Sequence, residues 1–183
     1  MGATPNQQNP ELADTPALVS HLLDQINQLI NTQALDQPLV IGIHTGGVWL
    51  AKVIAEHLQA PLGQLDIAFY RDDFSKNGLH PQVSPSSLPF NINDRHLLLV
   101  DDVLMSGRTV RAAMNELFDF GRPASIKLVT LCSVNQRELP IQADVCALAL
   151  DLEAGQYLQL DGPENLKLSI IEQANHELSL IHI

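Results

Sequence analysis

Continuous apolar runs alternate along this chain with segments whose apolar residues recur at helical spacing. This pattern limits the possible folds more than any other feature of the sequence. An apolar run without polar alternation is typical of a strand that is buried on both faces. Apolar residues at helical spacing stand between several of these runs, as at Ala51, Ile54 and Leu58. The pattern predicts an α/β domain with a mainly parallel central sheet flanked by helices, in which ligands bind at the carboxyl ends of the strands. The predicted sheet strands are 38–44, 65–70, 96–102, 125–134 and 143–150.

The length of the chain suits one globular domain. The 183 residues are too few for a second full domain, and we place the single domain at 15–183. Residues 1–14 are polar and have no periodicity, so we interpret them as a loose leader. Thr15 and Pro16 are typical of a helix N-cap and of a first helical residue, so the first helix is predicted to begin there.

A long polar connection separates two of the predicted strands. It begins after Tyr70 and is rich in proline and glycine, which in a compact domain is typical of a lid or a binding loop. We place this lid at 71–95. Two short strand candidates lie near the other end of the chain, at 157–161 and 166–172.

The charge balance limits the partners of the protein. There are 10 lysines and arginines against 21 aspartates and glutamates, which gives a formal net charge of -11 at pH 7. The average field of such a chain repels nucleic acid and anionic membranes. Because no lysine or arginine precedes Lys52, a site for an anion must be built from backbone N–H groups and a few arginines.

Other compositional signals are weaker. Cys132 and Cys146 lie in apolar, strand-like runs, so we expect two small buried thiols and no disulfide. The histidines and cysteines show no metal-ligand spacing. The sequence has no basic segment followed by an apolar signal region, and no apolar run of the length that a membrane helix needs. We therefore expect a cytoplasmic protein.

The stretch Leu97–Ala113, which reads LLLVDDVLMSGRTVRAA, carries the strongest functional signal. After an apolar strand, Asp101 and Asp102 are expected where the chain leaves the sheet. A turn of small residues, Met105–Thr109, then leads into a helix. The unpaired N–H groups and the positive dipole end at the start of a helix suit a phosphate, and Gly107 allows the backbone to approach it closely.

Two carboxylates beside a phosphate cradle repel the anion itself, so they must serve another part of the ligand. Asp101 and Asp102 suit the two hydroxyls of a ribose, or a magnesium ion. The combination predicts a site for a ribose 5-phosphate, to which the hydroxyls of Ser106 and Thr109 add donors. A simpler interpretation makes Thr109 the N-cap of the helix, but it leaves the two aspartates unexplained.

The run LLLVDDVLMSGRT resembles the motif with which type I phosphoribosyltransferases bind 5-phosphoribosyl 1-diphosphate. The segments IGIHTGG, LDIAFYRDDFSK, VRAAMNELFDFGRP and RELPIQAD are similar to the PyrR family, whose members are pyrimidine operon attenuation regulators that also act as uracil phosphoribosyltransferases. The likeness extends from about Leu39 to Asp144. It implies the type I phosphoribosyltransferase fold, with a parallel sheet, a small hood over the base and a flexible lid loop.

The resemblance also implies roles for individual residues. Asp101 and Asp102 are implied to contact the ribose and to hold magnesium, directly or through the substrate, and Arg71 at the start of the lid is implied as a further catalytic residue. The other implied contacts are Met105, Ser106, Gly107, Arg108 and Thr109 for the 5′-phosphate, Thr45, Gly46 and Gly47 for the diphosphate, and Val134 and Arg137 for the base.

Two segments depart from the family pattern. The family usually has Thr-Arg-Gly in the diphosphate loop, so Gly46 replaces a guanidinium. A charged hydrogen bond contributes about 1.5–3 kcal/mol, and its loss is expected to weaken activity without abolishing it. Before RELPIQAD the family typically has Val-Asp-Arg-Gly-His, whereas Cys132–Gln136 reads CSVNQ, which leaves the choice of base open.

The implied reaction is the formation of UMP and diphosphate from uracil and 5-phosphoribosyl 1-diphosphate, in a homo-oligomer. An alternative is a nucleotide-sensing regulator of pyrimidine genes that binds UMP or phosphoribosyl diphosphate and has lost most turnover. A third interpretation, a structural or partner-binding relic, does not explain why Asp101, Asp102 and Gly107 are present.

The number and positions of the charged residues predict weak or absent binding to attenuator RNA. Neutralisation of phosphates by lysine and arginine supplies much of the affinity for nucleic acid. This chain is acidic and has Gln142 where the family commonly has arginine. Titration with a pyrimidine-operon leader RNA at physiological salt measures the affinity, and tight, sequence-selective binding would contradict the prediction.

Overall fold

The structure is a computed structural model that describes residues 14–67 and 86–172. Within these ranges no helix is long and apolar enough to cross a membrane. The described residues form three helices and seven strands, which are α1 (Thr15–Gln33), β1 (Leu39–Ile43), α2 (Gly46–Leu58), β2 (Leu62–Leu65), β3 (His96–Leu104), α3 (Arg108–Phe120), β4 (Ser125–Val134), β5 (Val145–Leu150), β6 (Gln156–Asp161) and β7 (Lys167–Glu172).

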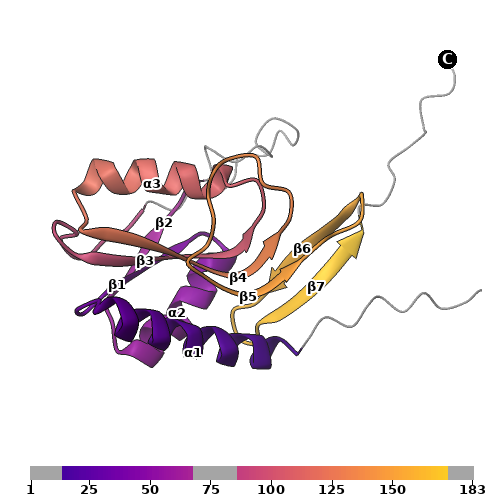
Figure 1. Ribbon diagram of the computed structural model, residues 1–183, viewed down its shortest axis with the longest axis horizontal. Coiled ribbons are helices and arrows are strands. Elements are labelled where there is room, and N and C mark those ends of the chain that lie inside the picture. Colours follow the sequence, from indigo (N-terminus) through magenta and orange to yellow (C-terminus); the bar gives the residue numbers. More distant parts are fainter. Residues whose placement is uncertain (1–13, 68–85, 173–183) are drawn as a thin grey trace, which may run out of the picture.

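Five strands form one parallel sheet that is covered on both faces. Their order is β2-β1-β3-β4-β5. Helices α1 and α2 cover one face and α3 covers the other (Figure 1). Val40 and Val100 pack in the layer of α1 and α2, whereas Ile41 and Leu99 pack in the layer of α3. Both faces of β1 and β3 therefore need apolar side chains, which explains the unbroken apolar runs and confirms the predicted fold class.

The strand predicted at 65–70 is misplaced. Strand β2 ends at Leu65, and the next backbone N–H, that of Asp66, donates to Ser86 Oγ at 3.0 Å instead of continuing the ladder. A side chain distant in sequence thus satisfies the first donor after the strand. Residues 68–85, which include most of the predicted lid, lie outside the described residues.

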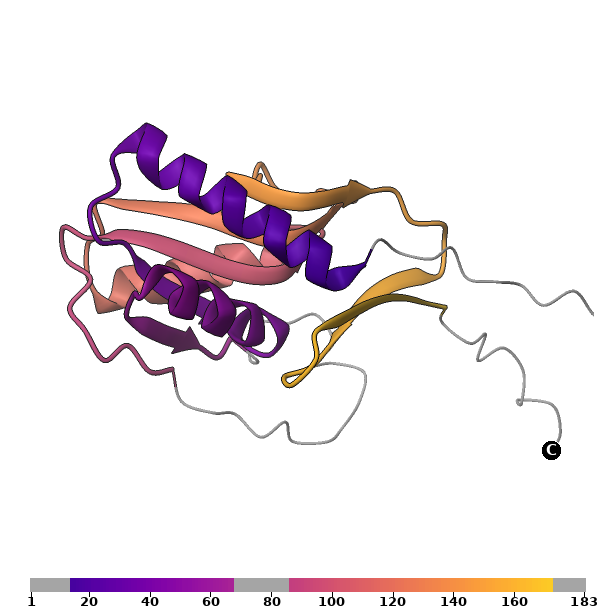
Figure 2. The same ribbon diagram turned by 90° about the horizontal axis from the view of Figure 1, so that it is seen from below.

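The antiparallel hairpin of β6 and β7 stands apart from the parallel sheet, beyond the carboxyl ends of its strands (Figures 1 and 2). This is the position of the predicted hood. Leu160 and Leu168 of the hairpin are buried in the same apolar cluster as α1 and α2. Apolar packing against the two helices therefore holds the hairpin in place.

Thr15 also connects the hairpin to α1. Its Oγ1 accepts a hydrogen bond from the backbone N–H of Leu168 at 2.9 Å, and Thr15 is only 6% exposed. The prediction that Thr15 is the N-cap was wrong, because the N-cap position belongs to Asp14, which makes no side-chain cap bond. The hydroxyl of Thr15 satisfies a donor of the hood instead of one of its own helix.

Replacement of Thr15 by valine is expected to destabilise the protein, because it leaves the buried N–H of Leu168 without an acceptor. The expected loss in the free energy of unfolding is about 1–3 kcal/mol. Urea denaturation measures it, with Thr15→Ser as the matched control that keeps the hydroxyl. Equal loss in both variants would show that the hydrogen bond is not the cause.

Candidate active site

The two adjacent aspartates lie inside β3 and not at its end. The prediction that they mark the point where the strand leaves the sheet was wrong, because β3 pairs with β4 as far as Leu104, and Asp101 lies opposite Thr130. The carboxylate of Asp101 is 3% exposed and accepts a hydrogen bond from the backbone N–H of Asp102 at 3.1 Å. Asp102 is half-buried and lines a pocket together with Asp101.

The predicted phosphate loop forms a tight turn between β3 and α3. Gly107 has a φ of 91°, in the left-handed region that favours glycine, and occupies the N-cap position of α3. Ser106 Oγ accepts a hydrogen bond from the N–H of Arg108 at 3.2 Å. The alternative role of Thr109 as N-cap does not hold, because α3 already begins at Arg108.

A second segment holds this loop from behind. The carbonyl of Ser106 accepts hydrogen bonds from the N–H groups of Glu138 and Leu139, at 3.1 and 3.0 Å. A Cβ on Gly107 would lie 3.3 Å from the Cβ of Ile141. The loop is thus supported by the connection between β4 and β5 and is not a free surface turn.

The aspartates and the phosphate loop line a single pocket of about 500 Å³. The pocket includes all five predicted phosphate-loop residues. Tyr157 and Leu158 of the hood and Gln136 also line it, and sequence reasoning did not assign them to the site. The run around Tyr157 was predicted only as a strand, and nothing local indicates that this strand folds back over the end of β3.

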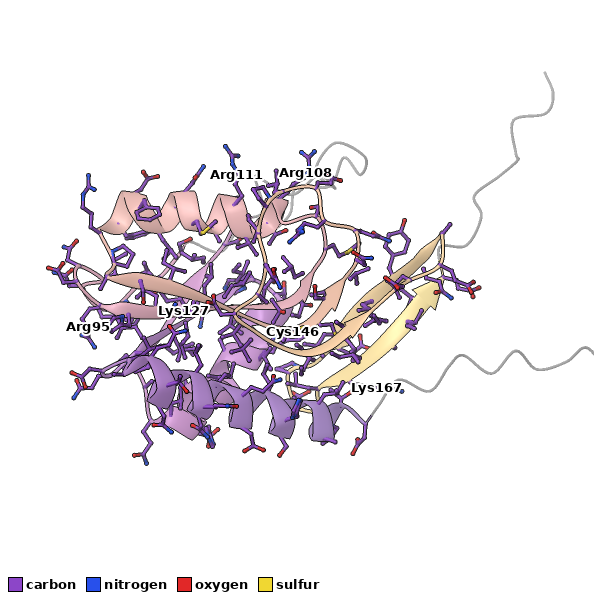
Figure 3. The ribbon with its side chains drawn as sticks, in the orientation of Figure 1. Arg95, Arg108, Arg111, Lys127, Cys146 and Lys167 are labelled. Carbon is purple, nitrogen blue, oxygen red and sulfur yellow. The ribbon has the colours of Figure 1, made fainter. Side chains whose placement is uncertain are left out.

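Arg108 lies at the rim of this pocket. Its Nε donates to Glu138 Oε2 at 2.7 Å, and the two side chains are 53% and 54% exposed. Such an exposed ion pair adds little stability. Figure 3 shows Arg108 and Arg111 projecting from the start of α3, at the opposite end of the sheet from Arg95. The few cations of the chain thus include one at the phosphate loop.

The predicted diphosphate loop lies directly against the aspartates. Helix α2 begins at Gly46, and a Cβ on this glycine would lie 2.6 Å from the carboxylate carbon of Asp102. A Cβ on Gly47 would lie 2.6 Å from the carbonyl oxygen of Val100. Thr45 precedes the helix and is exposed. Gly47 therefore allows the start of α2 to approach the backbone of β3 closely, and Gly46 leaves room for the side chain of Asp102.

His44 directly follows the last residue of β1 and precedes this loop. Its Nε2 lies 3.1 Å from Gln64 Oε1, so its partner is a side-chain amide of the neighbouring strand β2. The contact places β2 next to the diphosphate loop.

The predicted base contacts line a neighbouring pocket. Val134 is buried, Arg137 is exposed, and both line a cavity of about 420 Å³. This cavity shares Leu104 and Met105 with the pocket of the phosphate loop. The structure therefore brings the predicted base contacts next to the pocket of the phosphate loop, across the end of β3.

Arg71, the predicted catalytic residue at the start of the lid, lies outside the described residues.

Glu116 of α3 is half-buried and accepts a hydrogen bond from Ser86 Oγ. Burial, together with the nearby Cys146 and Asp102, raises the pKa of the Cys132 thiol to about 12. Cys132 is thus a protonated, inert thiol near neutral pH and no nucleophile.

The donor set fits a magnesium ion that arrives with a substrate. The described part of the chain contains no group of three or more histidines, cysteines, aspartates or glutamates that could hold a metal. Asp101 and Asp102 nevertheless place two carboxylates at the pocket. Magnesium is commonly held by one or two carboxylates together with substrate phosphates and water. These residues therefore suit a magnesium–substrate complex better than a resident metal.

Comparisons with known proteins agree with this geometry. Residues 8–153 match the family model of the phosphoribosyl transferase domain. A structure of a hypoxanthine-guanine-xanthine phosphoribosyltransferase superposes with a TM-score of 0.61 at 20% identity, covering 88% of this chain and 92% of the other. A purine phosphoribosyltransferase from Pyrococcus horikoshii superposes with a TM-score of 0.56 at 21% identity, covering 73% and 83%. At these identities the two structures show the fold alone.

Closer relatives narrow the family. The bifunctional protein PyrR of Pseudomonas fluorescens is 52% identical over 165 residues, which are 89% of this chain and 98% of that protein. The bifunctional protein PyrR of Nitrosococcus oceani is 51% identical over 169 residues, 90% and 96% of the two chains. The resemblance inferred from the motifs is thereby confirmed, and the chain belongs to the PyrR family of phosphoribosyl transferases.

Proposed function

We propose that this protein is a uracil phosphoribosyltransferase and a regulator of pyrimidine biosynthesis, which forms UMP and diphosphate from uracil and 5-phosphoribosyl 1-diphosphate. The observation that carries the proposal is one pocket that combines the N-terminus of α3, the Asp101–Asp102 pair and the hood. Membership of the PyrR family supports it. We place the reaction in the cytoplasm, in line with the expectation from the sequence.

The ribose phosphate occupies the pocket at the end of β3. The backbone N–H groups at the start of α3, with the hydroxyls of Ser106 and Thr109, bind the 5′-phosphate. Arg108 stands at the rim with its charge shared with Glu138, so the backbone and the helix dipole supply most of the attraction. Asp101 and Asp102 accept hydrogen bonds from the two ribose hydroxyls.

The base lies where the two pockets meet, over Leu104 and Met105. Val134 and Arg137 border it on the side of β4, and Tyr157 with its neighbour Leu158 covers it from the hood. A pocket lined mainly by apolar side chains, with a few polar groups at its edge, is typical of a site for a small planar ligand such as a base.

The chemistry is a substitution at the anomeric carbon of the ribose. A ring nitrogen of uracil forms a bond to that carbon, the bond to the diphosphate oxygen breaks, and its electron pair leaves with the diphosphate. The nitrogen loses its proton. Thr45, Gly46 and Gly47 direct backbone N–H groups towards the departing group. Magnesium bound with the substrate supplies positive charge that stabilises the diphosphate. The role of Arg71 stays a prediction.

A second candidate is a nucleotide sensor with little turnover. The two aspartates and the phosphate loop line one pocket, whereas Gly46 offers no guanidinium to a diphosphate. Such a protein would bind UMP or phosphoribosyl diphosphate and act through a protein or nucleic acid partner. A homo-oligomer fits either candidate.

The replacement Asp102→Asn tests the proposed function. We expect the unchanged protein to form UMP from uracil and phosphoribosyl diphosphate with magnesium, and the variant to lose about 10²–10³-fold in rate, because an amide cannot replace the negative charge beside the ribose. A spectrophotometric assay of UMP formation measures both. If neither protein forms UMP but calorimetry still detects UMP binding, the result would favour the nucleotide sensor.

Gly46→Ala is expected to lower UMP formation by about 10- to 100-fold, because the new methyl group must displace the carboxylate of Asp102, and a small misplacement of a catalytic group is costly. For the same reason, Gly46→Arg is not expected to raise activity. Steady-state kinetics with phosphoribosyl diphosphate measures the effect.

Gly63→Ala in β2 is the matched control for this prediction. Its added methyl also meets side-chain ends, those of Leu88 and Phe90, at 2.7 and 2.9 Å, but away from the aspartates. Unchanged activity of Gly46→Ala, or an equal loss in Gly63→Ala, would contradict the proposed contact between Gly46 and Asp102.

A further inference from the structure

Trp49 is the only tryptophan of the chain and lies at the start of α2, within the first turn after the diphosphate loop. It is half-buried and packs against the apolar cluster shared by α1, α2 and the hood. The indole ring of Trp49 also lies against Gly162, in the turn between β6 and β7. A Cβ on Gly162 would lie 2.7 Å from Cε3 and 3.0 Å from Cδ2 of Trp49. The backbone of the hood turn thus rests directly on the indole ring.

The same hairpin carries the residues that cover the nucleotide pocket. Tyr157 and Leu158 of β6 line the pocket, and Gly162 directly follows the last residue of that strand. In the same first turn of α2, Gly46 lies against the carboxylate of Asp102. One short helical turn therefore contacts both the hood above the base and the acid beside the ribose.

We infer that Trp49 is a positioning residue that couples the diphosphate loop to the hood, so that the position of α2 sets how closely the hood covers the base. The inference rests on the proposed function, because it requires that the hood contacts a base. Trp49 itself does not line either pocket of the site. Its effect is therefore expected on the affinity for a ligand that reaches the hood, and not on the binding of the ribose phosphate alone.

Two ligands separate these effects. UMP carries a base and has no diphosphate, whereas phosphoribosyl diphosphate has a diphosphate and no base. We expect Trp49→Leu and Gly162→Ala each to raise the Kd of UMP about tenfold while changing the Kd of phosphoribosyl diphosphate less than about twofold. Isothermal titration calorimetry with magnesium measures both constants in the full chain.

The double variant Trp49→Leu with Gly162→Ala tests the contact itself. Because leucine is smaller than tryptophan, it leaves room for the methyl group that Gly162→Ala adds. The second replacement is therefore expected to change the Kd of UMP little when the first is present, so that the two effects are not additive. Independent, additive effects would show that the two residues do not act through each other.

Intrinsic fluorescence gives a second readout in the unchanged protein. UMP does not occupy the diphosphate loop, so a saturable change in Trp49 emission on UMP binding reports movement through the hood. Gly162→Ala keeps Trp49 and is expected to lose most of this change. For Trp49→Leu, the control for loss of an aromatic ring is Phe118→Leu, whose Kd for UMP is expected to stay unchanged. Phe118 is 58% exposed on α3 and remote from the contact between Trp49 and Gly162.

The outcomes distinguish this inference from the proposed function. Failure of the unchanged protein to bind UMP would overturn both. UMP binding with the same Kd in the unchanged protein, Trp49→Leu and Gly162→Ala would overturn the inference alone. A folded Gly162→Ala variant, checked by circular dichroism, that loses UMP affinity and keeps its affinity for phosphoribosyl diphosphate would support it.

Discussion

The pairing of β3 with β4 is the interaction on which the rest of the site depends. Because the two strands stay hydrogen-bonded as far as Leu104, Asp101 and Asp102 are held by a rigid sheet and not by a loop. The same pairing determines where the chain turns, so the loop that ends at Gly107 begins beside the aspartates. A ligand that contacts both the aspartates and the loop needs a constant distance between them, and a central strand of a parallel sheet provides it.

The chain is acidic, yet its pocket suits a ligand that carries phosphate. The conflict is resolved locally, because the start of α3 presents backbone N–H groups and the positive end of a helix dipole without any need for lysine. Arg108, the cation at this point, is paired with Glu138. A site built in this way can attract a phosphate although the net charge of the chain repels polyanions. Weak RNA binding stays a prediction.

The hood depends on contacts that are distant in sequence. Thr15 binds the backbone of β7, and Trp49 supports the turn between β6 and β7. A two-stranded hairpin is marginally stable alone, so its position over the pocket must come from such contacts. The first turns of α1 and α2 thereby help to position the side of the pocket that Tyr157 and Leu158 line.

By itself the sequence determined the parallel α/β core, the phosphate loop and the aspartate pair, because these are local patterns: apolar runs, a glycine before a helix, and adjacent carboxylates. The resemblance to the PyrR family implied a diphosphate loop at Gly46 and Gly47, which stays a prediction. Only the tertiary structure decided that Asp101 and Asp102 lie within β3, that Thr15 serves the hood, and that Tyr157 reaches the pocket. These features arise from hydrogen bonds and packing between segments that are far apart in the chain, which no local pattern of residues encodes.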